Sequence, residues 1–175
     1  EDLDDATALA KNFGIDMITV DLTETRSSII SAMKTELSDG AKANIAPRLR
    51  MTTLYAIAQT RNALVVGTGN RSESYMGYFT KWGDGAYDLD PIADLTATEI
   101  FDFLRYLKAP RNIIEKAPSA GLFEGQTDEK EMGVTYKDID EYIMTGKTNP
   151  ESQAIIERYH KNSEHKRRMP SVFGE

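Results

Sequence analysis

The feature of this chain that most restricts its fold is an uninterrupted apolar run at residues 63–66, which leads directly into a Gly-Thr-Gly turn at 67–69. An apolar run without alternation is typical of a strand that is buried on both faces of a parallel sheet. Apolar residues recur at helical spacing before this run, over 44–61, and after it, over 96–107. This alternation of helix and buried strand predicts an α/β fold with a parallel sheet.

Five further segments have the spacing of regular elements. Helices are expected where apolar residues recur with a helical period, over 4–13, 27–37, 136–144 and 150–159. The first should end at Gly14 and the second at Asp39-Gly40, because such residues commonly terminate helices. Residues 15–22 predict a short strand. No repeat or linker interrupts the pattern, so we expect one domain over residues 1–175.

Composition narrows the chemistry. The chain contains no cysteine, which removes disulfides, cysteine-based zinc sites and thiol nucleophiles and favours a reducing, cytoplasmic setting. Its only histidines, His160 and His165, lie close together near the end, and a Gly-x-Ser-x-Gly elbow is absent, so a serine triad is unsupported. A net charge of −7 argues against binding to nucleic acid, and no apolar run is long enough for a membrane span. Acidic side chains remain as metal ligands, which favours Mg²⁺ together with phosphates.

The expected site is the loop that follows residue 66, because ligands of open α/β sheets bind beyond the carboxyl ends of the strands. Small residues within 67–73 would let a ligand approach the backbone, and the carboxylate of Glu73 is suited to a hard cation. The alternative is an ordinary strand-to-helix turn with Glu73 in solvent.

Three later segments carry further candidate chemistry. Residues 77–88 combine aromatic rings with a lysine and two aspartates, which suits stacking on a flat ring beside a polar edge, unless the segment is an apolar loop packed on the core. Ser119, in the turn at 118–122, could bond a phosphate, and the acidic stretch at 125–129 could be a mobile lid, unless both belong to a plain surface loop. The basic residues at 164–168 could grip a phosphate or a ribose, or lie solvated in a tail.

Taken in order, these segments resemble the ammonia-dependent NAD synthetases of the N-type ATP pyrophosphatase superfamily. The matching strings lie at 44–51, 67–73, 77–85, 118–122 and 164–167. The resemblance implies a Rossmann-like, adenine nucleotide alpha hydrolase-like fold of three layers around a parallel sheet. It also implies a ligase that adenylates the carboxylate of deamido-NAD with ATP, releases pyrophosphate, and then lets ammonia displace AMP to give NAD. This chemistry needs no covalent protein nucleophile, in agreement with the absence of cysteine.

The same resemblance assigns roles to individual residues. Contacts to deamido-NAD are implied for Arg48, Tyr78, Phe79, Lys81, Asp88, His165 and Lys166. It implies ATP contacts for Thr68 and Ser119, a Mg²⁺ ligand at Glu73, and a catalytic role for Asp84 in receiving or deprotonating ammonium. It further implies a homodimer, with the helix that carries Arg48 near the partner subunit.

Two departures from the family pattern stand out. The Ser-Gly-Gly-x-Asp-Ser loop that cradles the ATP pyrophosphate is absent, and its expected place is upstream of Glu1. We therefore expect an N-terminally incomplete domain that does not adenylate on its own. Ala97 occupies the position of a lysine that contacts ATP, and losing such a charge-assisted contact weakens binding by about 1.5–3 kcal/mol unless another cation substitutes.

Two other functions remain open from the sequence. One is an ATP pyrophosphatase of the same fold that adenylates and amidates a different acceptor. The other is a dimerising nucleotide-binding module without catalysis, which the missing loop and Ala97 would suit. Within the preferred function, ammonia is the expected nitrogen source, because glutamine-using relatives carry an amidase domain with a catalytic cysteine.

Overall fold

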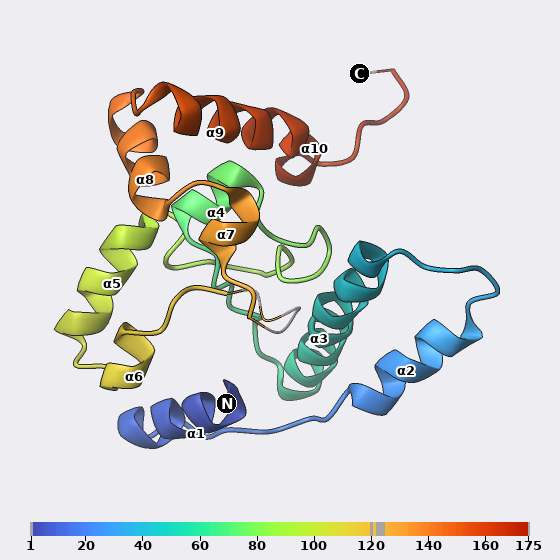
Figure 1. Cartoon of the computed structure of the whole chain (residues 1–175). Coiled ribbons are helices and arrows are strands. Elements are labelled where there is room, and N and C mark those ends of the chain that lie inside the picture. Colours follow the sequence, from blue (N-terminus) through green and yellow to red (C-terminus); the bar gives the residue numbers. More distant parts are fainter. Residues whose placement is uncertain (1, 120, 122–124, 175) are drawn as a thin grey trace.

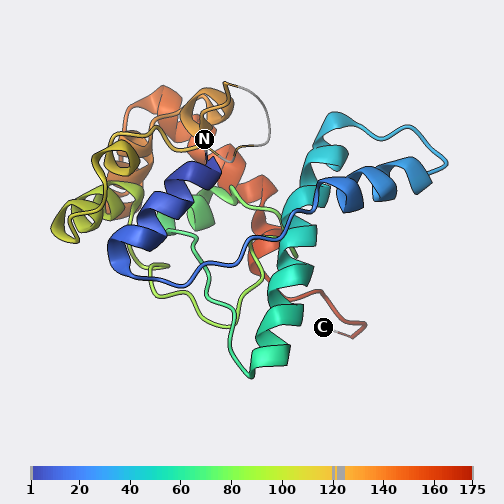
Figure 2. The same ribbon diagram turned by 90° about the horizontal axis from the view of Figure 1, so that it is seen from below.

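The computed structural model describes residues 2–119, 121 and 125–174. Helices form most of the regular structure (Figure 1). Their bounds are α1 Asp2–Phe13, α2 Thr23–Ala32, α3 Asp39–Arg61, α4 Arg71–Met76, α5 Ala97–Tyr106, α6 Arg111–Ile114, α7 Asp128–Met132, α8 Tyr136–Thr145, α9 Pro150–Asn162 and α10 Glu164–Arg167. Helices α4 to α10 pack together into one body, whereas α2 and α3 form an arm that projects to one side of it (Figure 2). Among the described residues, no helix combines the length and apolarity needed to cross a bilayer.

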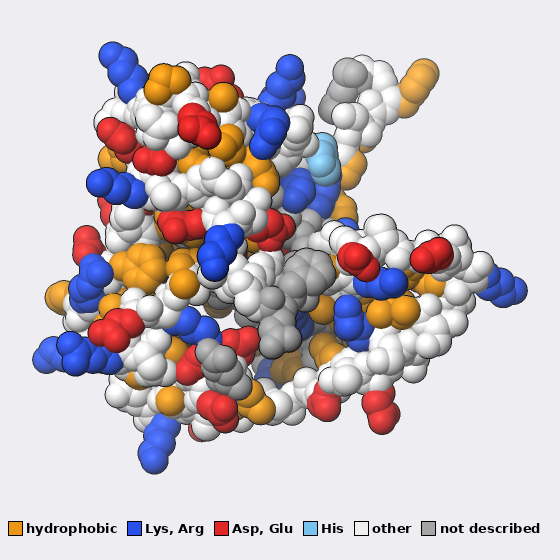
Figure 3. All heavy atoms as spheres, viewed as in Figure 1, with side chains coloured by type: hydrophobic (Ala, Val, Ile, Leu, Met, Phe, Trp, Pro, Cys, Tyr) orange, Lys and Arg blue, Asp and Glu red, His pale blue; other side chains and the backbone are white. Residues whose placement is uncertain are grey.

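The hydrophobic core lies between α4, α5, α8 and α9. Met76, Ile139 and Ile156 are fully buried there, and Ala97 is only 4% exposed. By contrast, α1 and α2 bury no residue, and apolar side chains lie exposed among charged ones on the face seen in Figure 3. The firmly packed part of the chain is therefore the body that surrounds α4.

The longer helices follow the sequence pattern, although some of their ends differ and the short helices α4, α6, α7 and α10 were not predicted. Helices α1, α5, α8 and α9 confirm the segments expected from helical spacing, and Gly14 follows α1 with a positive φ of 64°. The prediction that Asp39-Gly40 ends a helix is wrong, since α2 already ends at Ala32 and Asp39 begins α3. Ser38 caps α3 by accepting from the backbone N–H of Ala41 at 3.3 Å, and an acidic residue in a first turn complements the helix dipole.

In the part of the chain that the structure describes, the expected strands are reduced to one parallel bridge. Val66 pairs with Leu89, and the N–H of Gly67 donates to the carbonyl of Leu89 at 2.7 Å. The prediction that residues 63–66 are buried on both faces is wrong. The side chains of Leu64 and Val66 are 67% and 54% exposed. The strand predicted over 15–22 is also not formed. No neighbouring strand pairs with it in the described part of the chain, and an extended segment needs such a partner for stability.

A buried carboxylate joins three helices of the body. Asp140 of α8 accepts from the hydroxyl of Ser72 in α4, and from both the N–H and the hydroxyl of Thr98 in α5, at 2.8 and 2.7 Å. The N–H of Ala97 in turn donates to the Ser72 hydroxyl at 3.0 Å. This network fixes the start of α4, and with it the loop that precedes α4.

Gly77 ends α4 at a point where a side chain has no room. Its φ is 66°, and a Cβ at this position would overlap the Cβ of Ser163 at the end of α9. Both the left-handed backbone and the contact with Ser163 therefore require glycine. We expect Gly77→Ala to lower the free energy of unfolding by about 2–4 kcal/mol, measured by urea denaturation. Gly146→Ala is the control: its φ is 74° but nothing lies near its Cβ, so the loss should be about 1 kcal/mol.

Candidate active site

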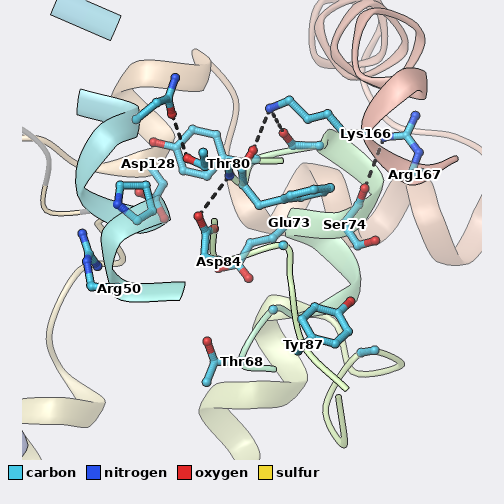
Figure 4. Close-up of a pocket in the computed structure, with 18 of the residues that line it drawn as sticks. Arg50, Thr68, Glu73, Ser74, Thr80, Asp84, Tyr87, Asp128, Lys166 and Arg167 are labelled. Atoms are coloured by element: carbon cyan, nitrogen blue, oxygen red, sulfur yellow. Dashed lines mark hydrogen bonds between the residues drawn. The ribbon is translucent and has the colours of Figure 1, made fainter. Parts of the chain in front are cut away.

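A pocket of about 620 Å³ opens between α3, α4, the loop at 77–87 and α10 (Figure 4). That volume is typical of small-molecule sites. Residues from both halves of the chain line it, namely Asn44, Pro47, Arg50, Thr68, Gly69, Glu73, Ser74, Gly77, Tyr78, Phe79, Thr80, Asp84, Gly85, Tyr87, Ala93, Ser119, Asp128, Glu131, Lys166 and Arg167. The glycine-rich turn after the bridge at Val66 therefore does open into a cavity, as the position of the turn predicts.

The pocket brings together most of the residues singled out from the sequence. Thr68, Glu73, Tyr78, Phe79, Asp84, Ser119 and Lys166 all line it. Arg48, Lys81, Asp88 and His165 do not. Ala97 also lies away from the pocket, packed in the core.

Glu73 occupies the pocket because of its place in α4. Asn70 caps this helix by accepting from the N–H of Glu73 at 2.9 Å, and the carboxylate of Glu73 accepts from the N–H of Asn70 at 2.9 Å. Burial raises the pKa of Glu73 from its ordinary value of 4.5 to about 7, and the carboxylates of Asp128, Asp84 and Asp90 add to the rise. The turn predicted from the sequence is present, but Glu73 does not lie in solvent.

The raised pKa makes stability depend on pH in a defined direction. Between about pH 4.5 and 7 the folded protein holds a proton on Glu73 that the unfolded chain has lost, so stability falls as pH rises through this window. Glu73→Gln removes this titration. We therefore expect the free energy of unfolding of the variant, compared with that of the natural protein, to be higher at pH 8 than at pH 4.5. Urea denaturation at both pH values measures the difference. Glu99→Gln is the control, because the pKa of Glu99 is lowered by its hydrogen bonds to Thr96 and no such gain should appear.

Lys166 fastens α10 to the wall of the pocket. Its ammonium donates to the carbonyls of Gly77 and Phe79 at 2.8 and 2.7 Å and lies 5.4 Å from the centre of the Phe79 ring. Burial lowers the pKa of Lys166. Asp84 accepts from the N–H of Thr80 at 3.1 Å, which shapes the same loop from its other side. The loop at 77–84 is thus held by both a cation and a carboxylate.

Three of the residues that lie outside the pocket are linked to one another beside it. The guanidinium of Arg48 donates to the carbonyl of Lys81 at 3.4 Å, and the ammonium of Lys81 donates to the carbonyl of His165. Asp88 is engaged elsewhere, since it accepts from the N–H of Val65 at 2.7 Å and from the hydroxyl of Tyr55 at 3.4 Å. The sequence motifs therefore converge in space, although the side chains of Arg48, Lys81 and Asp88 bond protein atoms.

Several pocket residues were missed by sequence reasoning. Asn44, Pro47 and Arg50 recur every third residue and so lie along one face of α3. That spacing was the available signal. Tyr87 lies on the other side of the pocket from Arg50 in Figure 4. Its ring is so close to Gly67 that a Cβ on Gly67 would lie 2.7 Å from two ring carbons.

Asp90 has a buried oxygen without a hydrogen-bond partner among the described residues. Its Oδ1 accepts from the N–H of Ile92 at 3.2 Å, whereas Oδ2 is buried and makes no hydrogen bond within the described residues. This Oδ2 and the Oε2 of Glu73 both lie beside Gly69, at 3.6 and 3.9 Å from where its Cβ would be. No group of three or more metal-ligating side chains occurs in the described ranges, but two carboxylates suit Mg²⁺ that is also held by phosphates.

Comparison with known proteins assigns the family. Residues 1–170 match the family described as NAD synthase. The chain belongs to the NAD synthase family. It is 52% identical to the NH(3)-dependent NAD(+) synthetase of Carboxydothermus hydrogenoformans, across 98% of this chain and 72% of that protein. Identity to the protein of the same name from Pyrococcus furiosus is 40%, across 97% and 72%.

Two solved structures share the fold. An NMN synthetase from Francisella tularensis superposes with a TM-score of 0.96 at 40% identity, covering 99% of this chain and 73% of that one. An NH3-dependent NAD synthetase from Campylobacter jejuni superposes with a TM-score of 0.77 at 26% identity, covering 98% and 71%. The Rossmann-like α/β class predicted from the sequence is thereby confirmed, although this chain itself shows one parallel bridge within the described residues.

Proposed function

We propose that this member of the NAD synthase family is a ligase that amidates deamido-NAD to NAD with ammonia, through an adenylate formed from ATP. The observation that carries the proposal is that Thr68, Glu73, Asp84, Ser119 and Lys166, which are far apart in sequence, line one pocket. The names of the relatives, NH(3)-dependent NAD(+) synthetase, support both the product and the nitrogen source. The absence of cysteine agrees with a reaction that needs no protein nucleophile.

The acidic side of the pocket suits Mg²⁺. Glu73 would be its principal ligand, and the Oδ2 of Asp90, which has no hydrogen-bond partner within the described ranges, is a second oxygen beside the same glycine. When bound, the ion neutralises charge on the phosphates of ATP. Glu73 must be ionised to hold it, so cation affinity should rise as pH passes about 7.

The remaining residues would bind and orient the substrates. The hydroxyls of Thr68 and Ser119 would contact ATP, and the rings of Tyr78 and Phe79 would flank the nicotinate ring. Asp84 would receive ammonium close to the carbonyl that ammonia attacks. Holding the partners in place converts a meeting of three molecules into a reaction within one complex.

Five further contacts to deamido-NAD are proposed in and around the pocket, at Arg48, Lys81, Asp88, His165 and Lys166. Arg48, Lys81 and His165 are linked by hydrogen bonds beside it, which supports their acting as one rim. Lys166 follows His165 in the chain, and its ammonium donates to the carbonyl of Phe79 in the pocket wall. Asp88 would act from beside α3, where it accepts from the hydroxyl of Tyr55.

A second acceptor has an observation in its favour. The NMN synthetase superposes on this chain with a higher TM-score, 0.96, than the NAD synthetase from Campylobacter jejuni, 0.77. The product NMN implies a nicotinate mononucleotide acceptor, which offers the same carboxylate on the same ring. The amidation chemistry would be unchanged, and the acceptor would lack the adenylate half of deamido-NAD.

The test is a direct competition in the full-length protein. It is supplied with ATP, Mg²⁺, ammonium and equal amounts of deamido-NAD and nicotinate mononucleotide, and chromatography measures NAD, NMN and AMP. We expect NAD with stoichiometric AMP. Predominant NMN would replace the proposed acceptor by the second one. Nucleotide binding without AMP from either acceptor would instead establish a non-catalytic module.

We also propose a homodimer located in the cytoplasm. The projecting arm of α2 and α3 supports the dimer (Figure 2), as does the exposure of Leu54 on α3, at 52%. The cysteine-free sequence supports a reducing compartment. Light scattering on the eluting protein would measure the mass directly, and a monomer at micromolar concentration would contradict the dimer.

A further inference from the structure

Three cationic side chains line the pocket, and two of them are engaged by the protein. Lys166 donates to two backbone carbonyls. Arg167 donates to the carbonyl of Tyr75 at 3.2 Å, to the hydroxyl of Ser163 at 2.7 Å and to the carboxylate of Glu164 at 3.2 Å. These cations hold α10 in place, so few of their donors are free for a ligand.

Arg50 is the third cation and differs from the other two. It lines the pocket and is exposed. In the part of the chain that the structure describes, its guanidinium makes no hydrogen bond and no ion pair. All five of its N–H donors are therefore available to a ligand.

The register of α3 directs Arg50 towards the pocket. The side chain of Asn44 accepts from the hydroxyl of Thr80 at 2.8 Å, which fixes one face of α3 against the pocket loop. Pro47 and Arg50 follow on that face at intervals of three residues. Arg48 is only two residues from Arg50, but two residues turn a helix by about 200°, so Arg48 points elsewhere.

We infer that Arg50 binds a phosphate group of the acceptor nucleotide in this pocket. The inference rests on the proposed function and adds a residue that the family motif does not assign. The pocket also holds the carboxylates of Glu73, Asp84, Asp128 and Glu131, which would repel an anion. A phosphate therefore needs a cation with free donors nearby, and the planar guanidinium binds two phosphate oxygens at once.

The test compares ligands that differ only in the phosphate. Isothermal titration measures the dissociation constants of nicotinate mononucleotide and of nicotinate riboside for the natural full-length protein, Arg50→Gln and Arg50→Lys. Arg61→Gln is the matched control, because Arg61 is the exposed last residue of the same helix and does not line the pocket. Thermal denaturation should show all variants folded, since Arg50 makes no polar bond to any other side chain that the structure describes.

We expect Arg50→Gln to raise the dissociation constant of the mononucleotide by about tenfold or more, as is usual for the loss of a charge-assisted hydrogen bond. The dissociation constant of the riboside should not change. Arg50→Lys should recover part of the loss. Equal mononucleotide affinity in Arg50→Gln and the natural protein would overturn the inference, as would an equal loss for the riboside. A natural protein that binds neither nicotinate compound would also overturn the inference, but it would leave the proposed amidation of deamido-NAD standing, because the competition assay tests that function separately.

Discussion

Glu73→Gln is expected to reduce turnover by about a hundredfold or more, measured as AMP formation at saturating ATP, acceptor and ammonium. Glutamine has the same shape and still offers an oxygen to the N–H of Asn70, so the cap of α4 survives. What the substitution removes is the negative charge that would hold Mg²⁺ beside Gly69. The loss should be accompanied by a weaker dependence of the rate on Mg²⁺ concentration.

A matched control exists in the next helix. Glu99 has the same position in α5 that Glu73 has in α4, and its carboxylate accepts from the N–H of Thr96 at 2.8 Å. Glu99 does not line the pocket, so Glu99→Gln should retain nearly full turnover. Turnover of Glu73→Gln within threefold of the Glu99→Gln variant would show that the carboxylate of Glu73 has no part in the reaction.

Asp140→Ala is expected to lower the free energy of unfolding by about 3–5 kcal/mol. The substitution leaves the hydroxyl of Ser72 and both donors of Thr98 without their buried acceptor. For a chain of this size each kcal/mol corresponds to about 2–4 °C in Tm, so thermal denaturation should show a drop of about 10 °C.

Two further variants make this prediction specific. Asp102→Ala removes an exposed carboxylate that pairs with Arg105 three residues along α5, and surface pairs of this kind contribute about 0.5 kcal/mol or less. Ser72→Ala and Asp140→Ala combined should destabilise by less than the sum of the single effects, because they break one network. Full additivity, or an Asp140→Ala loss as small as that of Asp102→Ala, would contradict the network described above.

Local sequence patterns predict the helices well, because their signals are local. Helical spacing and a capping serine or threonine are complete within a few residues, as for Thr96 at the start of α5. Strands depend on a partner elsewhere. Residues 15–22 have the apolar residues of a strand but no neighbour among the described residues to pair with, and at 63–66 only Val66 forms a bridge.

The sequence predicted the location of the candidate site, but only some of the residues that line it. The glycine-rich turn and the motif resemblance place Thr68, Glu73 and Ser119 correctly in one pocket. They do not separate Arg48 from Arg50, because that distinction depends on which face of α3 packs against Thr80. The motifs also do not show in which direction a side chain donates. Lys81 follows the pocket residue Thr80 in the chain, but its ammonium donates to the backbone carbonyl of His165.

The attachment of α10 to α4 bears on when the site can form during synthesis. One wall of the pocket depends on Lys166 reaching the carbonyls of Gly77 and Phe79, and on Ser163 donating to the carbonyl of Met76 at 3.1 Å. Those bonds join residues almost ninety positions apart. A nascent chain that has exposed α4 but still holds α10 inside the ribosome lacks this wall, so we expect the complete pocket to form only after α10 has emerged.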